Sequence, residues 1–288
     1  IVYTILFAIS LLPLRMLFIL SDVAYIVIYH LIGYRKNIVM NNLAIAFPDK
    51  TISERKSIAK QFYHNLTDTF IETIKMISIG PKELARRGNC DLTLINDLLS
   101  KGKNIHILVG HQFNWEFANL MYAKQVNAPF IGIYKPISNK VIGRIFLRSR
   151  SRFGSILVAT DSFKHKMHHL MQKQYVLALA ADQNPGIPKQ AFWLRYFGKP
   201  APFITGPGKL SMMKNTAVVF VSFTKTGRGH YSFKTTLLAE NSRDHTSEEI
   251  TMLYRTQLEK EIRQAPSNYL WSHRRWRHEW KEGYRAVL

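Results

Sequence analysis

Residues 104–122 read NIHILVGHQFNWEFANLMY, and this stretch decides how we interpret the fold. An apolar run typical of a buried strand ends at Gly110. Polar residues follow, and among them Asn114 is of a type that caps the first turn of a helix. We therefore predict a strand, a short turn that carries His111, and a helix whose first turn carries Glu116.

Several other short apolar runs resemble this strand. Turns or helical segments separate them, which is the pattern of a mixed α/β fold. Runs this apolar are typical of strands that are buried on both faces. We therefore predict an α/β fold with a central, mostly buried mixed sheet flanked by helices. The runs are NIHILVG (104–110), PFIGIY (129–134), SILVAT (155–160), YVLALAAD (175–182), AVVFVSF (217–223) and YSFKTTLLA (231–239).

Two capping boxes, at 51–54 and 246–249, predict the starts of two long helices. The first helix should end at Gly80 and the second before Pro266. Packing against the sheet is the simplest interpretation of both, with membrane contact as an alternative for the first. Its apolar stripe comprises Ile58, Phe62, Leu66, Phe70, Ile74 and Ile77.

The amino-terminal residues 1–33 are almost entirely apolar. A spanning helix needs about 20 apolar residues, so there is room for one tilted span or a hairpin bent at a proline. Arg35 and Lys36 follow and would lie on the cytoplasmic side. We predict a membrane anchor at 1–33 and a single catalytic domain at 34–288, with a buried core helix as the alternative for the anchor. The interruptions are Pro13, Arg15, Asp22 and His30.

The composition is strongly basic, with 40 Lys plus Arg against 19 Asp plus Glu and a formal charge of +21. Such a surface attracts nucleic acid, anionic lipid headgroups or an acidic protein, and the charge alone does not choose among them. The single cysteine, Cys90, excludes an intrachain disulfide framework and fits a reducing compartment. No internal repeat or long linker divides the chain.

His111 and Glu116 form a candidate acid–base pair. If both lay in one helix, a spacing of five residues would place their side chains about 140° apart. With His111 in the preceding turn, the imidazole can fold back, so we expect the two side chains within hydrogen-bond reach. Glu116 would fix one imidazole nitrogen, and the other would take a proton from an alcohol that attacks an acyl carbonyl.

Other catalytic patterns are missing from the sequence. It contains no Gly-x-Ser-x-Gly elbow, so the attacking hydroxyl should belong to a substrate. A His–Glu pair alone supplies too few ligands for a metal ion, and His-Glu-x-x-His is absent. We therefore expect neither a metal nor a cofactor.

The carboxyl-terminal segment YLWSHRRWRHEWKEGYR (269–285) interleaves tryptophan with arginine. This pattern suits a membrane interface, where indoles lie at headgroup depth and guanidinium groups meet phosphates. It also suits single-stranded nucleic acid, by stacking and backbone charge. A third interpretation is an ordinary packed tail with solvated arginines.

The chain resembles the late acyltransferases of lipid A biosynthesis, within the wider group of glycerolipid acyltransferases that carry His-x-x-x-x-Asp/Glu. The resemblance covers nearly the whole chain, and the order of the blocks makes it specific. After the apolar amino terminus they are NNLAIAFPDKTISERKSIAKQFYHNL (41–66), HQFNWE (111–116), YKP (134–136), RSR (148–150), ADQNPG (181–186) and FGKPAPFITGPGKL (197–210).

The resemblance implies a membrane-bound O-acyltransferase on the cytoplasmic face of the inner membrane. It would move a fatty acyl group from acyl carrier protein to a hydroxyl of a phosphate-bearing lipid A precursor. His111 would be the general base and Glu116 its partner. A basic surface would attract both the acidic carrier protein and lipid phosphates. The residues implied to hold phosphate, stabilise the oxyanion or shape the site are Lys135, Arg148, Arg150 and Asp182.

Three departures from the family pattern concern the acceptor. Lys135 stands where relatives often have arginine, Asn184 where many have aspartate, and WSHRRWR (271–277) differs from the best-known enterobacterial members. The same chemistry on an amino-acid lipid, a glycolipid or a lysophospholipid is therefore an alternative. A basic nucleic-acid-binding protein is a more remote one, because no recognised nucleic-acid motif accompanies the charge.

Overall fold

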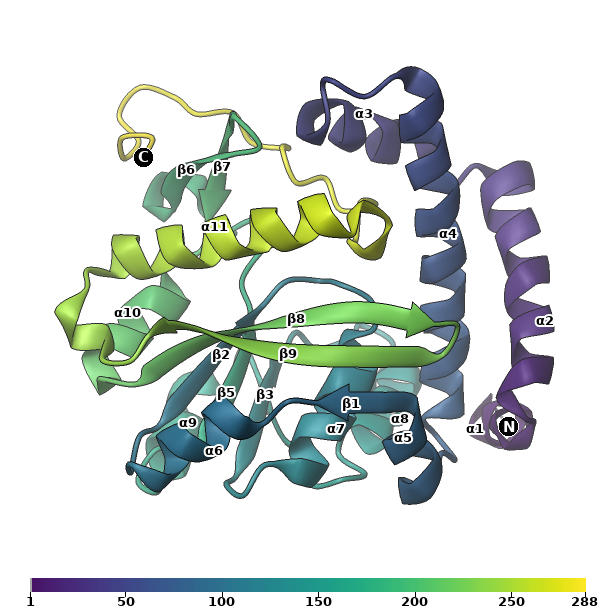
Figure 1. The fold of residues 1–288 in the computed structure, drawn as a ribbon, viewed down its shortest axis with the longest axis horizontal. Helices are drawn as coiled ribbons and strands as arrows, with labels where there is room; N and C mark the ends of the chain where they lie inside the picture. The colour runs from purple at the N-terminus through teal and green to yellow at the C-terminus, as the bar shows by residue number, and fades with distance from the viewer. Residues whose placement is uncertain (1) are drawn as a thin grey trace.

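The computed structural model describes residues 2–288, apart from the side chain of Lys164, and is built around a seven-stranded sheet (Figure 1). The strand order is β1-β9-β8-β2-β5-β3-β4. Neighbouring strands are parallel except in the antiparallel hairpin β8–β9, so the sheet is mixed, as predicted. The strands are β1 (Gly88–Cys90), β2 (Ile105–Val109), β3 (Phe130–Tyr134), β4 (Ile156–Ala159), β5 (Val176–Ala180), β8 (Ala217–Gly227) and β9 (His230–Ala239).

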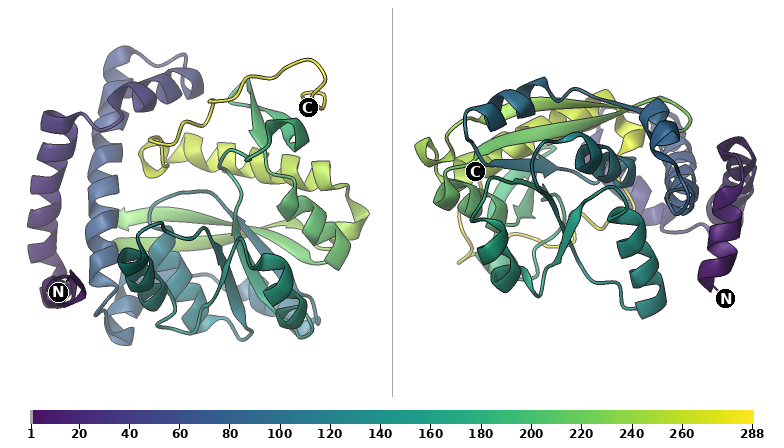
Figure 2. Two further views of the ribbon diagram at one scale, coloured as in Figure 1. Left: turned by 180° about the vertical axis from the view of Figure 1, so that it is seen from behind. Right: turned by 90° about the horizontal axis from the view of Figure 1, so that it is seen from below.

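The sheet is buried on both faces because successive residues of its central strands join two different apolar clusters. In β2, Leu108 packs into one cluster, and Ile105 and Ile107 pack into the other. Helices supply the rest of each cluster and lie on both sides of the sheet (Figure 2). One set comprises α3 (Lys36–Ala46), α4 (Ile52–Lys75) and α11 (Ser247–Gln264), and the other α5 (Pro81–Arg87), α6 (Thr93–Ser100) and α7 (Trp115–Gln125).

Shorter elements complete the body. A separate antiparallel hairpin, β6–β7, lies near α11 and the carboxyl terminus (Figure 1). The remaining helices lie between consecutive strands of the chain. These elements are β6 (Phe192–Tyr196), β7 (Lys199–Phe203), α8 (Lys140–Arg150), α9 (Phe163–Leu170), α10 (Gly206–Lys214), and the short 3₁₀ turns η2 (Pro188–Gln190), η3 (Ser242–Asp244) and η4 (Pro266–Asn268).

Both predicted capping boxes, at 51–54 and 246–249, form as reciprocal side-chain and backbone hydrogen bonds. The predicted apolar stripe of α4 is wrong at Phe70, which is 56% exposed and lines a cavity. The reason is that the carboxyl half of α4 turns charged side chains inward. Asp68 and Glu72 are buried there, held by ion pairs and hydrogen bonds.

The amino-terminal helix lies alongside α4 (Figure 1). Its segment Leu14–Ile32 is long and apolar enough to cross a membrane, and only 17% of its apolar window is buried. Leu17 is fully buried, whereas Ile19 is 63% and Leu31 75% exposed, so this is not a buried core helix. The elements of this region are α1 (Val2–Leu11), α2 (Leu14–Tyr25) and the π-helical η1 (Ile26–Ile32).

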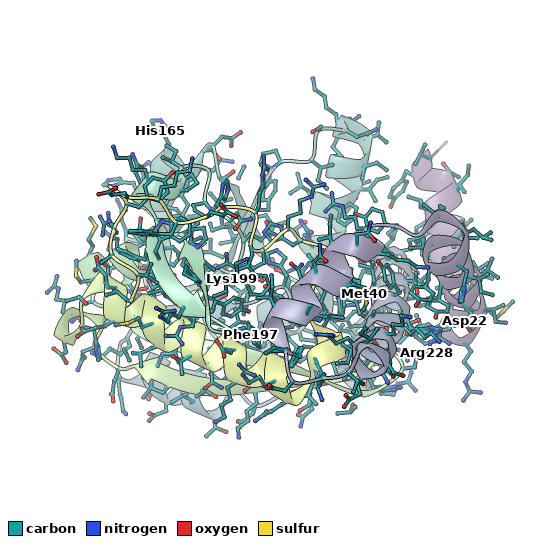
Figure 3. All side chains as sticks on the ribbon, turned by 90° about the horizontal axis from the view of Figure 1, so that it is seen from above. Asp22, Met40, His165, Phe197, Lys199 and Arg228 are labelled. Carbon is teal, nitrogen blue, oxygen red and sulfur yellow. The ribbon has the colours of Figure 1, made fainter. Side chains whose placement is uncertain are left out.

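Ion pairs and hydrogen bonds join α2 to α4 and to the β8–β9 hairpin. The carboxylate of Asp68 in α4 accepts hydrogen bonds from Arg228 at 2.7 Å, from Lys225 at 3.0 Å and from Ser21 of α2 at 2.8 Å. Arg228, at the tip of the β8–β9 hairpin, also pairs with Asp22 of α2 (Figure 3). The aspartate that interrupts the apolar sequence therefore attaches α2 to the rest of the fold.

Gly208 provides a test of the packing between α10 and α11. A side chain at this position would overlap the carbonyl oxygen of Ser247, so we expect Gly208→Ala to lower the free energy of unfolding by about 1–3 kcal/mol. Gly206 in the same helix faces open space, and Gly206→Ala should stay within about 1 kcal/mol of the native protein. Denaturant unfolding of both variants measures the difference, and equal stabilities would contradict this packing.

Candidate active site

His111 and Asp182 lie side by side because the strands that precede them are paired in register. β2 and β5 are parallel neighbours, and Val109 pairs with Ala180. The residues two positions beyond this pair therefore meet at the same edge of the sheet. His111 Nδ1 lies 2.6 Å from Asp182 Oδ1, and the His111 backbone N–H donates to Asp182 Oδ2 at 3.0 Å.

The hydrogen bonds give the two imidazole nitrogens different roles. Nδ1 faces the carboxylate of Asp182, so the proton of the neutral imidazole belongs on this nitrogen. Nε2 lies 3.1 Å from the amide nitrogen of Gln183, a donor, and so acts as an acceptor. The side chain of His111 is 21% exposed, and that of Asp182 only 2%. Nε2 is therefore the nitrogen that can serve as a base.

Electrostatics raise the proton affinity of the imidazole and favour an ionised carboxylate beside it. Burial opposes the imidazolium, but the charge of Asp182 and its hydrogen bond raise the pKa of His111 above its usual value. Burial also opposes ionisation of Asp182, and His111 holds the pKa of that carboxyl below its usual value. Asp182 is thus suited to stabilise the charge that forms when His111 takes up a proton.

No hydrogen bond joins Glu116 to His111, which contradicts our expectation of direct contact. The local structure is as predicted, since Asn114 caps α7 and Glu116 lies in its first turn. The Glu116 carboxylate instead accepts two hydrogen bonds from Arg150 of α8, one from Nε at 2.7 Å and one from Nη2. A guanidinium offers two parallel donors that match a carboxylate, whereas an imidazole offers one.

A buried carboxyl group beneath the site positions the start of α7. Asn114 Oδ1 accepts from the backbone N–H groups of Glu116 and Phe117, at 2.9 and 3.2 Å. Its Nδ2 donates to Glu72 Oε2 at 2.7 Å, and the hydroxyl of Tyr231 donates to the same oxygen at 2.6 Å. Glu72 is fully buried, and burial raises its pKa to about 7.

A cavity of about 590 Å³ adjoins the histidine. Gln183 and Trp115 line it, and both contact the imidazole of His111. The ring centroids of Trp115 and His111 are 5.5 Å apart. A second cavity, of about 440 Å³, shares Phe146 and Arg150 with the first. Apolar side chains from η1, α4, α8 and the carboxyl-terminal segment line the larger cavity, namely Ile28, Ile32, Leu66, Phe70, Phe146 and Leu270.

Two of the six predicted site residues lie outside this cluster. Lys135 is exposed just after β3, and Arg148 is exposed on α8, with its guanidinium over the ring of Tyr3 at 5.7 Å. Residues two apart on a helix do not share a face, so Arg148 and Arg150 point in different directions. Functional roles for Lys135 and Arg148 stay predictions.

Sequence reasoning missed Gln183 and Glu72. Gln183 directly follows Asp182, just beyond β5. Its position beside His111 could therefore be predicted once the pairing of β2 with β5 was known. The sequence contains one indication that Glu72 is buried, because this carboxylate stands among the apolar residues of α4. Within residues 2–288, no group of three or more His, Cys, Asp or Glu is placed to hold a metal ion.

The first part of the carboxyl-terminal segment packs against the body, whereas Trp280 in its second part is 41% exposed. Trp271 and Arg275 are each only 1% exposed, so they offer no stacking surface to nucleic acid. Asn184, one of the departures from the family pattern, accepts from Arg275 Nη1 at 3.2 Å and donates to the carbonyl of Arg274 at 2.7 Å. The tail therefore holds the loop that carries Asp182.

Glu72→Gln tests the buried carboxyl. The raised pKa means that the folded protein binds more protons at Glu72 than the unfolded chain between pH 4.5 and about 7, so the free energy of unfolding falls as pH rises through this window. The neutral glutamine removes this fall. We measure the free energy of unfolding of both proteins by denaturant unfolding at about pH 5 and pH 8. From the lower to the higher pH, the free energy of unfolding of the variant should increase by about 2–3 kcal/mol relative to that of the native protein.

Glu279→Gln, at an exposed carboxylate, is the matched control and should follow the native protein at both pH values. A difference between Glu72→Gln and the native protein that stays constant with pH would contradict the raised pKa.

Comparison with known proteins identifies the family. A family model described as bacterial lipid A biosynthesis acyltransferase matches residues 1–278. A lipid A biosynthesis palmitoleoyltransferase of Escherichia coli (strain K12) is 22% identical over 248 residues, covering 84% of this chain and 79% of the relative. A lipid A biosynthesis lauroyltransferase of the same organism is 25% identical over 247 residues, with the same coverage. The chain therefore belongs to the bacterial lipid A biosynthesis acyltransferase family and is an acyltransferase.

Proposed function

We propose that this acyltransferase moves a fatty acyl group from the thioester of acyl carrier protein to a hydroxyl of a lipid A precursor. The observation that carries the proposal is the His111–Asp182 pair beside a cavity with apolar walls. A base beside space for alkyl chains suits acyl transfer, and the names of the relatives suggest the acceptor. A thioester is an activated acyl donor, so the transfer needs no metal.

Nε2 of His111 accepts the proton of the acceptor hydroxyl while the hydroxyl oxygen attacks the thioester carbonyl carbon. A carbon–oxygen bond forms and the carbonyl oxygen becomes an oxyanion. Asp182 stabilises the imidazolium at this stage. The tetrahedral intermediate then collapses, the carbon–sulfur bond breaks, and the proton on Nε2 passes to the departing thiolate. The products are the acylated lipid and the carrier thiol.

Arg150 is suited to stabilise the oxyanion. Its Nε and Nη2 are bound by Glu116, while Nη1 has no hydrogen-bond partner among the residues that the structure describes. Because Arg150 lines both cavities, Nη1 is available to a substrate oxygen there. Glu116 then acts by fixing this guanidinium, and its charge also favours the protonated His111. This replaces the role of direct partner to His111 that we expected for it.

The amino-terminal helix supports a membrane location for the reaction. Its exposed apolar residues suit contact with lipid, and Ile28 and Ile32 at its end line the catalytic cavity. Arg35 and Lys36 follow the helix, and the basic charge of the chain suits anionic headgroups. We place the enzyme on the cytoplasmic face of the inner membrane, where acyl carrier protein reaches the cavity from the aqueous side.

The acid–base pair is tested with His111→Ala and Asp182→Asn. We expect either variant to lower kcat for acyl transfer by about 10³-fold or more. In the native enzyme, activity should rise with pH through the pKa of His111, because only the neutral imidazole accepts a proton. Asp182→Asn removes the charge that raises this pKa, so the acidic limb of its residual activity should move to lower pH.

Asp161→Asn, at an exposed aspartate, is the matched control and should keep native kinetics. Full activity in both His111→Ala and Asp182→Asn would overturn the assignment of the pair.

The Glu116–Arg150 pair is tested with Glu116→Gln, Arg150→Gln and the double variant. Because the two residues act as one unit, each single change should lower kcat/KM by about 10²-fold, and the double variant should lose little more. Steady-state kinetics of the three variants measure the coupling. Losses that multiply in the double variant would show that the two residues act independently.

The acceptor is tested by comparing the lipids of the host by mass spectrometry with and without the gene. We expect lipid A to lose one acyl chain when the gene is absent. Loss of a chain from another lipid with lipid A unchanged would assign the same chemistry to that other acceptor.

A further inference from the structure

A third cavity lies away from the histidine, between α3, the start of β7 and the carboxyl-terminal segment. Its volume is about 500 Å³. Seen from above, Lys199 of β7 and Met40 of α3 are on the side of the molecule that faces the viewer (Figure 3). The polar side chains that line the cavity are Lys199, Arg274, Arg277, Asn41 and Asn42, and the apolar ones are Ile38, Ala44, Ile45 and Trp276.

The charges around this cavity are unbalanced. Lys199, Arg274 and Arg277 are exposed cations, and no carboxylate lines the cavity. Among the described residues, none of the three side chains takes part in an ion pair, in contrast to Arg150 and Arg228. Three like charges in one hollow repel one another, so an anion bound among them would relieve that repulsion.

The segment that carries two of these cations is held rigidly. Asn42 Nδ2 donates to the carbonyl oxygens of Trp271 and His273, at 2.7 and 2.8 Å. Asn184 Nδ2 donates to the carbonyl of Arg274 at 2.7 Å, and the Arg275 side chain is buried. Cations on a fixed backbone need less ordering when a ligand binds.

The same segment separates this cavity from the catalytic one. Ser272 and His273 line the catalytic cavity, whereas Arg274 lines the cationic one. His273 Nε2 accepts from the backbone N–H of Asn184 at 3.3 Å, next to the Gln183 that contacts the catalytic imidazole. The two cavities therefore lie next to consecutive residues of one segment, 272–274.

We propose that the cationic cavity binds a phosphate group of a substrate while another part of that substrate occupies the catalytic cavity. Two guanidinium groups and an ammonium group suit an anion with several oxygens, such as a phosphate. In the proposed function, both substrates supply this chemistry, the donor through the phosphate of its pantetheine arm and the acceptor through its sugar phosphates. The assignment of the phosphate to a substrate rests on that function, whereas the binding of phosphate itself does not.

A surface for bulk lipid is a poorer interpretation of this cavity. The strongly exposed apolar side chains cluster on α1, α2 and η1, and none of the residues that line this cavity is among them. The membrane-facing side proposed above and this cavity are therefore distinct.

The binding test uses inorganic pyrophosphate with the full chain in detergent at constant ionic strength, measured by isothermal titration calorimetry. The variant Lys199→Gln/Arg274→Gln/Arg277→Gln should bind pyrophosphate at least about tenfold more weakly than the native protein. The matched control Lys209→Gln/Lys214→Gln/Arg243→Gln removes three exposed cations elsewhere and should bind as the native protein does. Equal weakening in both variants, or none in either, overturns the proposal.

The kinetic test identifies the source of the phosphate. In the cavity variant, the KM for one substrate should rise about tenfold while kcat stays within about twofold of native. A rise for the acyl donor assigns the cavity to the pantetheine phosphate, and a rise for the acceptor assigns it to a lipid phosphate. Unchanged KM for both overturns the substrate role.

His111→Ala separates this proposal from the proposed function. This variant should bind pyrophosphate as the native protein does even though its kcat for acyl transfer falls by about 10³-fold or more. If the native enzyme fails to transfer acyl groups while pyrophosphate binding is lost only in the cavity variant, the proposed function fails and the anion site stands.

Discussion

The in-register pairing of β2 with β5 is the constraint on which the site depends. Both strands lie in the centre of the sheet, between apolar clusters that cover its two faces, so their register is fixed by the core. That register places His111 next to Asp182 and next to Gln183, the residue that follows Asp182 in the chain. His111, the proposed base, is thus oriented by buried strands at the centre of the sheet. A slip of one residue would turn the strand's core side chains to the opposite face and separate the pair.

Three buried carboxyl groups surround the start of α7, and each is stabilised by a different partner. Asp182 has an imidazole, Glu116 a guanidinium, and Glu72 the neutral donors of Asn114 and a tyrosine. Burial alone would raise the pKa of Asp182 and of Glu72. The pKa of Asp182 is lowered because its partner becomes a cation, whereas burial raises the pKa of Glu72 and the hydrogen bonds from its neutral partners offset only part of that rise. The partners therefore decide which carboxyl is ionised near neutral pH.

Features encoded by neighbouring residues could be predicted from the sequence. The capping boxes, the Asn114 cap, the apolar strand runs and the exposed amino-terminal helix depend on local pattern, and the structure contains them. The partner of His111 could not be found in this way, because β2 and β5 are neighbours in the sheet but far apart in the chain. Arg148 was grouped with Arg150 by motif, although helix geometry sends the two side chains to different faces. The inward turn of Asp68 likewise depends on Arg228, from the distant β8–β9 hairpin.

The contribution of η1 to the catalytic cavity has a consequence for how this enzyme can be handled. Ile28 and Ile32 belong to the exposed apolar helix and to the wall of the substrate cavity at once. Removing residues 1–33 to obtain a more soluble protein would therefore also remove part of the cavity wall. Under the proposed function, a lipid whose tails lie against this helix would reach the cavity along the same wall, without passing its hydrocarbon through water.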